Sequence, residues 1–182
     1  MRLPPLILEK IPLIKQWITT TLEKHKLYAR PVANLNFSNL PLYYSKRILN
    51  SAKIVIVDKI PIPPLSEMGL GELENLKNFE NGNYAGVTYM DTYFLLRDCL
   101  TNELLHFHEL VHIIQWEHLG IDKFLLTYGE GILQHGYINS PLEAMARKYE
   151  KLFNQKTSSY DIENSVRKEL DKIVSDIADN RT

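Results

Sequence analysis

The fold depends on the stretch from residue 105 to residue 115, LHFHELVHIIQ, in which polar side chains interrupt an apolar run. In a helix, His108 and His112 lie on one face, where both imidazoles can point at one cation. Glu109 lies about 100° around the helix and can reach a water molecule beside that cation without binding the cation itself. The spacing therefore predicts two metal ligands and one base.

The pattern His108-Glu109-Leu110-Val111-His112 is the HExxH spacing that zinc-dependent hydrolases use. Zinc lowers the pKa of a bound water towards ~7, and the glutamate can then accept its proton. Apolar residues surround the motif on nearly all sides, which predicts a buried helix. Polar groups in such a helix need partners, because unpaired burial is costly. The alternative is that both histidines are hydrogen-bonded core residues without a metal.

The composition is typical of one globular domain: 182 residues, 45% hydrophobic and 24% charged. The 21 Lys and Arg nearly balance the 22 Asp and Glu, so we expect no nucleic-acid partner. A single cysteine, Cys99, leaves no internal disulfide and fits a reducing compartment. No stretch resembles a secretory signal or reaches the ~20 apolar residues of a membrane span. We expect a cytoplasmic protein without membrane contact.

Periodicity and turn residues predict the elements along the chain. Before the motif we expect an extended lead at Pro4-Pro5, a helix at 11–24, a short helix at 40–49, a strand at 54–57, a loop or short helix at 69–83 and a strand at 85–96. The motif helix should begin near Thr101 or Asn102 and end at Gly120. Further helices are expected at 121–134, 140–155 and 160–178, with a turn at 136–139.

These elements predict an α+β fold that is mostly helical, with a small β-sheet preceding the motif helix. Residues 1–182 should form a single domain. Within it, the catalytic core should span about residues 52–155, flanked by an N-terminal and a C-terminal helix.

A zinc site needs a third protein ligand, and two residues compete for the role. His118 completes the metzincin pattern HExxHxxGxxH, but Gln115 replaces the glycine that turns the chain back, and a continuing helix puts His118 about 240° around from His112. Glu143 is the better candidate, since it lies in the first turn of the following helix. Ser140-x-x-Glu143 is, however, also a capping box, which needs no metal.

With Glu143 as third ligand, the arrangement resembles the gluzincins, zinc metallopeptidases with HExxH on one helix and a glutamate ligand on the next. The resemblance covers roughly residues 85–150 and looks most like small bacterial gluzincin-like proteins of undefined substrate. It implies a zincin-like fold, Zn²⁺ held by His108, His112 and Glu143, and Glu109 as general base in the hydrolysis of a peptide or protein substrate. It also implies that the strand at 85–96 forms the upper rim of the cleft.

Two positions depart from the gluzincin pattern. Many gluzincins have Asn before the glutamate ligand and Asp four residues after it, where this chain has Leu142 and Arg147. The carboxylate that orients a ligand imidazole is therefore missing at its usual place, and Glu150, on roughly the same helix face, is the candidate to replace it.

The donor that stabilises the oxyanion must come from another part of the chain. Tyr128, His135 and Tyr137 lie in the segment between the two ligand-bearing helices, and we take Tyr137 as the catalytic assignment among them. Two other functions stay open, namely a zinc-binding but non-catalytic zincin-fold interaction module and a metal-free helical domain. The sequence does not specify an oligomeric state.

Overall fold

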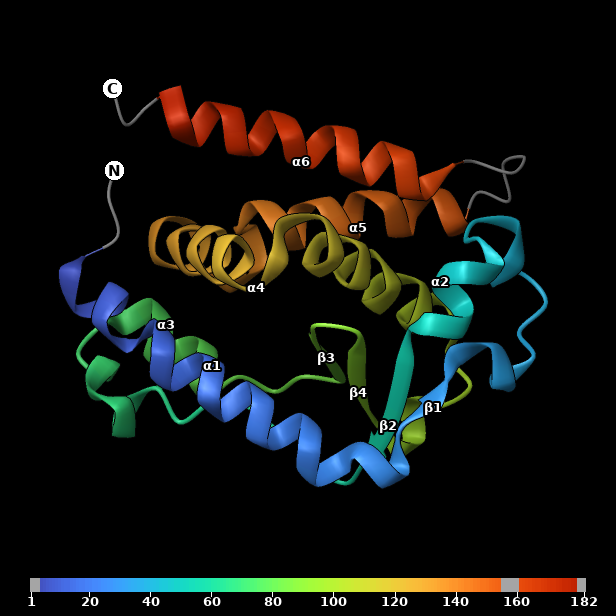
Figure 1. Cartoon of the computed structure of the whole chain (residues 1–182), viewed down its shortest axis with the longest axis horizontal. Helices are drawn as coiled ribbons and strands as arrows, with labels where there is room; N and C mark the ends of the chain where they lie inside the picture. Colours follow the sequence, from blue (N-terminus) through green and yellow to red (C-terminus); the bar gives the residue numbers. More distant parts are fainter. Residues whose placement is uncertain (1–3, 155–160, 180–182) are drawn as a thin grey trace.

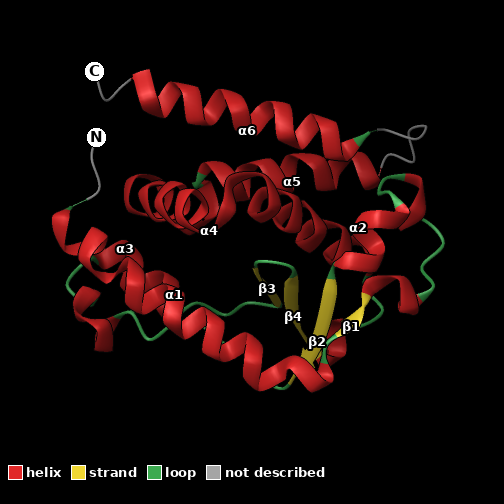
Figure 2. Cartoon of the chain, viewed as in Figure 1, coloured by secondary structure: helices red, strands yellow, loops and turns green. Residues whose placement is uncertain are grey.

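The computed structural model describes residues 4–154 and 161–179 (Figure 1). Helices make up most of this range, and four short strands form one sheet (Figure 2), so the prediction of a mostly helical α+β fold is confirmed. Within the described range, no helix is both long and apolar enough to cross a membrane.

The sheet has the strand order β1-β2-β4-β3 and precedes the motif helix in the sequence. Its strands are β1 (Arg30–Pro31), β2 (Lys53–Val57), β3 (Gly86–Tyr89) and β4 (Thr92–Leu96). β2 and β4 are parallel, and the two outer pairings are antiparallel. Tyr93, Phe94 and Leu95 are fully buried in succession, so both faces of β4 are covered. β3 forms one edge of the sheet.

The region from 85 to 96 is a β-hairpin, and the prediction of one continuous strand is wrong. Tyr89 pairs with Thr92 across the turn at Met90 and Asp91, and Met90 has a φ of 56°. Such turns usually carry Gly, Asn or Asp at the positive-φ position. Met90 is none of these residues, so the alternation of side chains along 85–96 continues through the turn and conceals it.

The N-terminal helix α1 (Pro5–His25) begins earlier than predicted, because proline is well tolerated in the first helical turn. Pro4-Pro5 is therefore not an extended lead. α1 lies along the sheet, where Trp17 meets the Tyr89 ring at 5.6 Å and His25 meets the Phe94 ring at 5.1 Å. The expected helix at 40–49 is split into a 3₁₀ turn (Leu40–Leu42) and α2 (Lys46–Ser51). The short helix in 69–83 is α3 (Glu74–Glu80).

The motif helix α4 (Glu103–Asn139) is interrupted at two glycines, where the sequence predicts a helix end and a turn. Asn102 caps its first turn by accepting a hydrogen bond from the Leu105 N–H. Gly120 (φ 69°, ψ 167°) and Gly136 (φ 71°, ψ 170°) leave the helical region of backbone space. The long helix consequently consists of successive segments, and Figure 1 shows it changing direction.

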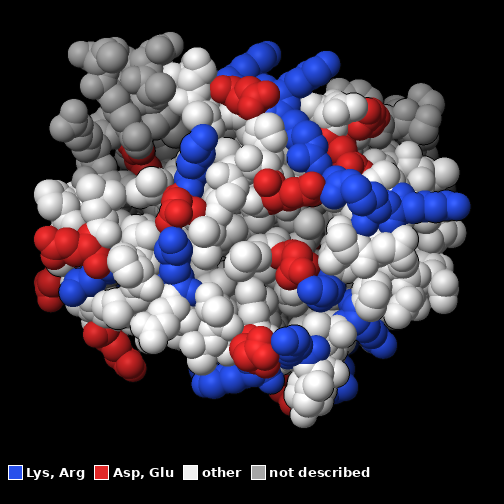
Figure 3. Space-filling model, in the orientation of Figure 1, with Lys and Arg blue, Asp and Glu red and all other residues white. Residues whose placement is uncertain are grey.

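The last two helices cover α4 on the side away from the sheet (Figure 1). α5 spans Pro141–Asn154, and α6 spans Ile162–Asp179. α6 contributes the fully buried side chains of Ile162, Val166 and Leu170. Position 155 of the predicted α5 and Tyr160 of the predicted α6 lie outside the described residues. On the face in Figure 3, acidic and basic side chains are intermixed, and the expectation of no nucleic-acid partner stays a prediction.

We expect Gly120→Ala to destabilise the protein by about 1–3 kcal/mol, because its backbone conformation is accessible almost only to glycine. The space around a new Cβ there is open, so the cost is conformational and not steric. Gly129→Ala, in a regular part of the same helix with equally open space, should stabilise by about 0.5–1 kcal/mol. Urea unfolding of both variants measures the difference. Equal effects would contradict the assignment of the helix break.

Candidate metal centre

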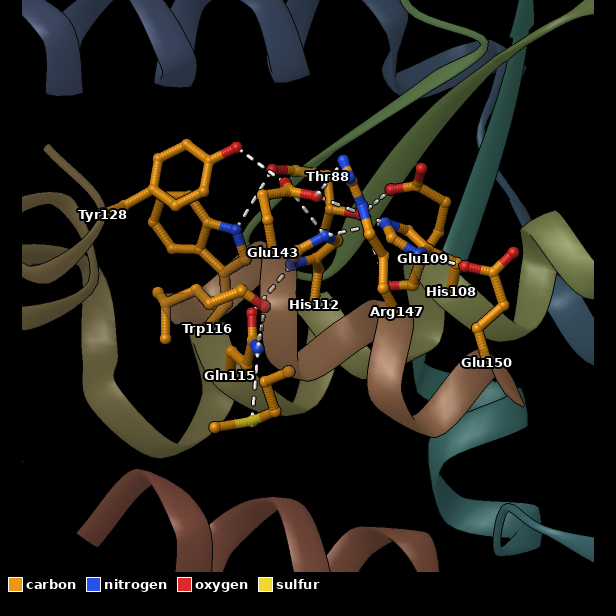
Figure 4. A network of polar contacts seen from close by, with 12 residues as sticks. Thr88, His108, Glu109, His112, Gln115, Trp116, Tyr128, Glu143, Arg147 and Glu150 are labelled. Atoms are coloured by element: carbon orange, nitrogen blue, oxygen red, sulfur yellow. Dashed lines mark hydrogen bonds and ion pairs between the residues drawn. The ribbon is translucent and has the colours of Figure 1, made fainter. Parts of the chain in front are cut away.

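His108, His112 and Glu143 converge between α4 and α5 (Figure 4). His112 Nε2 lies 3.2 Å from His108 Nε2 and 3.3 Å from Glu143 Oε1, and His108 Nε2 lies 3.6 Å from Glu143 Oε2. Zinc with ligands at about 2.0–2.1 Å in tetrahedral geometry holds ligand atoms about 3.4 Å apart. The two imidazole nitrogens are separated by close to that value, and each lies at about that distance from a different oxygen of Glu143. The three side chains are therefore close enough together to hold one zinc ion.

A buried carboxylate oxygen without a partner supports the same fit. The Glu143 side chain is 2% exposed, and its Oε2 atom makes no hydrogen bond among the described residues. The His108 side chain is 12% exposed, so the donors face a nearly closed space. Since an unpaired buried oxygen is costly, a cation is the natural partner for it.

Each ligand imidazole is oriented through its other nitrogen. His112 Nδ1 lies 2.7 Å from Gln115 Oε1, and the Gln115 amide in turn donates to the Leu142 carbonyl at 3.0 Å. His108 Nδ1 lies 3.3 Å from Glu150 Oε2, where the sequence predicts a replacement for the missing carboxylate. Because both partners are acceptors, Nδ1 carries the proton in each neutral ring and Nε2 keeps its lone pair for a metal.

The capping box proposed as the alternative role of Glu143 does not form. Ser140 Oγ is buried without a hydrogen-bond partner among the described residues. Glu143 Oε1 instead accepts a hydrogen bond from the Tyr128 hydroxyl at 2.9 Å, and the Ser140 N–H donates to the Tyr137 carbonyl. The glutamate therefore faces the two histidines and not the start of its own helix.

Glu109 turns from α4 towards the edge strand β3. Its Oε2 atom accepts a hydrogen bond from Thr88 Oγ1 at 2.6 Å, and the residue is 3% exposed. A Cβ atom at Gly86 would lie 2.5 Å from Glu109 Oε1, so the carboxylate packs directly on the strand backbone. Burial raises the pKa of Glu109 above its ordinary value, although His108, His112 and Thr88 act against it. A raised pKa suits a group that accepts protons near neutral pH.

Three stacked aromatic rings, which we call the aromatic ladder, connect Thr88, the partner of Glu109, to Glu143. Trp116 Nε1 donates to the Thr88 carbonyl at 3.1 Å. Its ring stacks on Phe124 at 3.7 Å, and Phe124 stacks on Tyr128 at 5.4 Å, across the break at Gly120. The Tyr128 hydroxyl bonds to Glu143. The ladder thus fixes the two helical segments that carry Glu109 and contact Glu143.

The remaining sequence candidates lie farther from the ligand trio or face elsewhere. Tyr137 packs edge-on to Tyr84 at 4.9 Å, and its hydroxyl makes no hydrogen bond among the described residues. Burial, followed by the charge of Glu143, raises the pKa of Tyr137 well above its ordinary value. His135 is exposed, and His118 pairs with Asp171 on α6 at 2.7 Å. Tyr137 is near enough to stay a candidate, whereas His118 does not join the donor set.

An apolar cavity of about 90 Å³ adjoins the site, with Glu109, His112 and Glu143 among its lining residues. About 10–15 Å³ of such volume holds one water, so the cavity has room for a ligand side chain. One of its walls is the isoleucine face of α1, formed by Ile7, Ile11, Ile14 and Ile18. The candidate site therefore extends beyond the predicted core of residues 52–155.

The pKa values of His108 and Glu143 are shifted in opposite directions by their proximity. Burial lowers the pKa of His108, but the adjacent carboxylates of Glu143 and Glu150 outweigh it and raise the pKa to about 10. Burial likewise raises the pKa of Glu143, but the charge of His112 and the contacts with both histidines hold it well below its usual range. At neutral pH the trio without metal therefore contains an imidazolium beside a carboxylate.

Comparisons of the chain with protein-family models, with curated proteins and with solved structures found no match. The functional argument therefore rests on the residues themselves, above all on the donor set and on the partners that orient it.

Exchange of Glu143 should weaken zinc binding, while exchange of His118 should not. Glu143→Gln keeps the size of the side chain but removes the negative charge that favours Zn²⁺, so we expect at least tenfold weaker binding, about the lower end for loss of a ligand contact. His118→Ala is the matched control, because its imidazole faces Asp171. Competition with a chromophoric chelator measures both affinities. Normal binding by Glu143→Gln with weak binding by His118→Ala would reject this donor set.

Zinc binding should release about one proton near neutral pH, because His108 must lose its proton before Nε2 can bind a metal. The apparent affinity should rise with pH until His108 titrates in the metal-free protein, near pH 10. Calorimetric titration in two buffers of different ionisation enthalpy measures the release. Glu150→Gln removes one of the carboxylates that raise the pKa, so it should reduce the release. Zinc binding without proton release would show that His108 is neutral in the metal-free site.

Proposed function

We propose that the protein is a zinc-dependent peptidase of gluzincin type with a zincin-like fold. His108, His112 and Glu143 would hold the zinc, and Glu109 would be the general base. The donor set carries this proposal, since its two imidazole nitrogens lie at a separation that suits one tetrahedral ion and each faces an oxygen of the buried Glu143. Its Oε2 atom makes no hydrogen bond among the described residues.

Bound zinc would supply a Lewis acid that lowers the pKa of a water towards ~7 and polarises a carbonyl. The chain's own contribution is a proton acceptor held in place. Thr88 fixes Glu109 through Oε2, which leaves Oε1 to take the proton from the attacking water and deliver it to the leaving amine. Burial raises the pKa of Glu109 and so favours its acceptance of the proton from water. Gln115 and Glu150 hold the imidazoles in the required tautomer.

The edge strand β3 supports a peptide as the substrate. β3 pairs with β4 on one side, and no described strand pairs with its other edge. Gly86, Val87, Thr88 and Tyr89 all line the cavity beside Glu109. An extended peptide can add to such an edge through main-chain hydrogen bonds and insert alternate side chains into pockets, provided that it leaves the Thr88 carbonyl to Trp116 Nε1. This arrangement would bring a scissile bond beside the base.

A zinc-binding module without catalytic activity is the second candidate function. It is favoured by the position of Tyr137, since the hydroxyl that donates to Glu143 comes from Tyr128 and not from Tyr137. Elemental analysis of protein purified without chelator separates either zinc function from a metal-free helical domain. Turnover of a peptide library separates the enzyme from the module.

Glu109→Gln should keep zinc and fold while lowering peptidase activity by about 10²–10⁴-fold, the usual contribution of a general base. The amide retains the shape of the side chain but cannot accept the proton. Glu117→Gln, the same exchange on an exposed part of the same helix, is the control and should leave activity unchanged. Zinc content and cleavage of a fluorogenic peptide library are measured together. Full activity in Glu109→Gln would show that Glu109 is not the base.

A further inference from the structure

Arg147 places a positive charge at the metal centre, where many gluzincins would have an aspartate. It lies one helical turn after Glu143 on α5, and its Nη2 atom is 3.8 Å from Glu143 Oε2. Its guanidinium also lies over the Tyr137 ring, 5.8 Å from the ring centre. Figure 4 shows the side chain rising from α5 beside the Glu143 carboxylate. Both of its neighbours, Glu143 and Tyr137, line the apolar cavity.

The N–H groups of the Arg147 guanidinium are available to a ligand. The contact with Glu143 is too long for a hydrogen bond, and Arg147 donates none to the described residues. An arginine carries five N–H donors in a planar fork that fits a carboxylate with two parallel bonds. The side chain is 37% exposed and so can be reached by a ligand, while the ring of Tyr137 limits its movement. A cation held this way next to a hydrolytic site points to an anionic group on the substrate.

The spacing to the metal centre indicates which anionic group. In a peptide, the last scissile carbonyl carbon and the terminal carboxylate carbon are separated by one N and one Cα atom, and so lie at most about 4 Å apart. Arg147 Nη2 lies 3.8 Å from Glu143 Oε2, so the guanidinium is a direct neighbour of the proposed metal centre and lies within reach of a group one residue away from a carbonyl bound there. A carbonyl at the metal centre and a terminal carboxylate at Arg147 can therefore belong to the two ends of one residue. The side chain of that residue would face the apolar cavity.

We propose, on the basis of the proposed function, that Arg147 binds the C-terminal carboxylate of a peptide whose last side chain is apolar. The enzyme would then release apolar residues from C-termini. In that hydrolysis the terminal C–N bond breaks, the carbonyl carbon gains the oxygen of water, and the leaving amine takes a proton through Glu109. Arg147 is the specificity residue, because a peptide that continues past the apolar residue, or that ends in an amide, has no main-chain carboxylate at that position for its fork to bind.

Binding of two matched probes tests the carboxylate site without turnover. We would titrate zinc-loaded protein with N-acetyl-L-phenylalanine and with its amide, which differ only in the terminal charge. The wild-type protein should bind the acid at least about tenfold more tightly, as expected for a charge-assisted bidentate contact. Arg147→Gln should remove that preference. Arg147→Lys should restore part of it, because it keeps the charge without the fork.

Controls separate this contact from other sources of affinity. Arg97→Gln removes a charge from an exposed arginine that is paired with Asp58, and it should keep the preference. N-acetylglycine, which lacks a side chain for the cavity, should bind more weakly than the phenylalanine derivative. Equal binding of acid and amide, no binding of the acid, or a preference that persists in Arg147→Gln would each overturn the proposal. The last result would place the carboxylate on zinc.

Cleavage assays keep the two proposals distinguishable. Peptides that end in Phe as the acid or as the amide should differ by at least tenfold in kcat/KM, about the factor in binding, and mainly through KM. If the protein binds the acid through Arg147 but cleaves neither peptide, the peptidase proposal fails and the carboxylate site stands. If it cleaves both equally well, the peptidase proposal stands and the role of Arg147 is rejected.

Discussion

The burial of Glu143 between α4 and α5 is the constraint on which the candidate site depends. A carboxylate at 2% exposure remains charged only beside compensating groups, and the two histidines of α4 are the nearest ones. The docking of α5 on α4 thus brings a second buried carboxylate, besides Glu109 of α4 itself, to the two imidazoles. The hydrogen bond from Gln115 to the Leu142 carbonyl fixes that docking one residue before the glutamate itself.

Much of this arrangement can be predicted from the sequence, because it rests on local periodicity. The spacing of His108 and His112 fixes their common helix face, and Glu143 follows a recognisable helix start. The breaks at Gly120 and Gly136 are predictable because glycine favours backbone conformations that other residues avoid. Met90 is the counterexample, since its positive φ is imposed by the pairing of β3 with β4 and leaves no local signal.

Contacts between distant segments could not be predicted in the same way. Nothing in the spacing of Thr88 and Glu109 announces a hydrogen bond between them, because it requires the hairpin to pack on α4. The sequence predicts a helix at 11–24 but not the surface on which it packs, and in the structure the isoleucine face of α1 forms a wall of the cavity next to Glu109. Gln115, a departure from one family pattern in the sequence, proves to orient His112 in the structure. Tertiary packing decides each of these roles.

The aromatic ladder has a mechanical consequence for this site. Its rings span the break at Gly120, the point at which α4 would otherwise bend most easily. Any bending there would shear Trp116 against Phe124 and pull Tyr128 away from Glu143 at the same time. The position of Glu143 is thus coupled to the angle between two helical segments. A change in that angle would change the distances from Glu143 to His108 and His112. A closely packed ladder therefore keeps these distances constant.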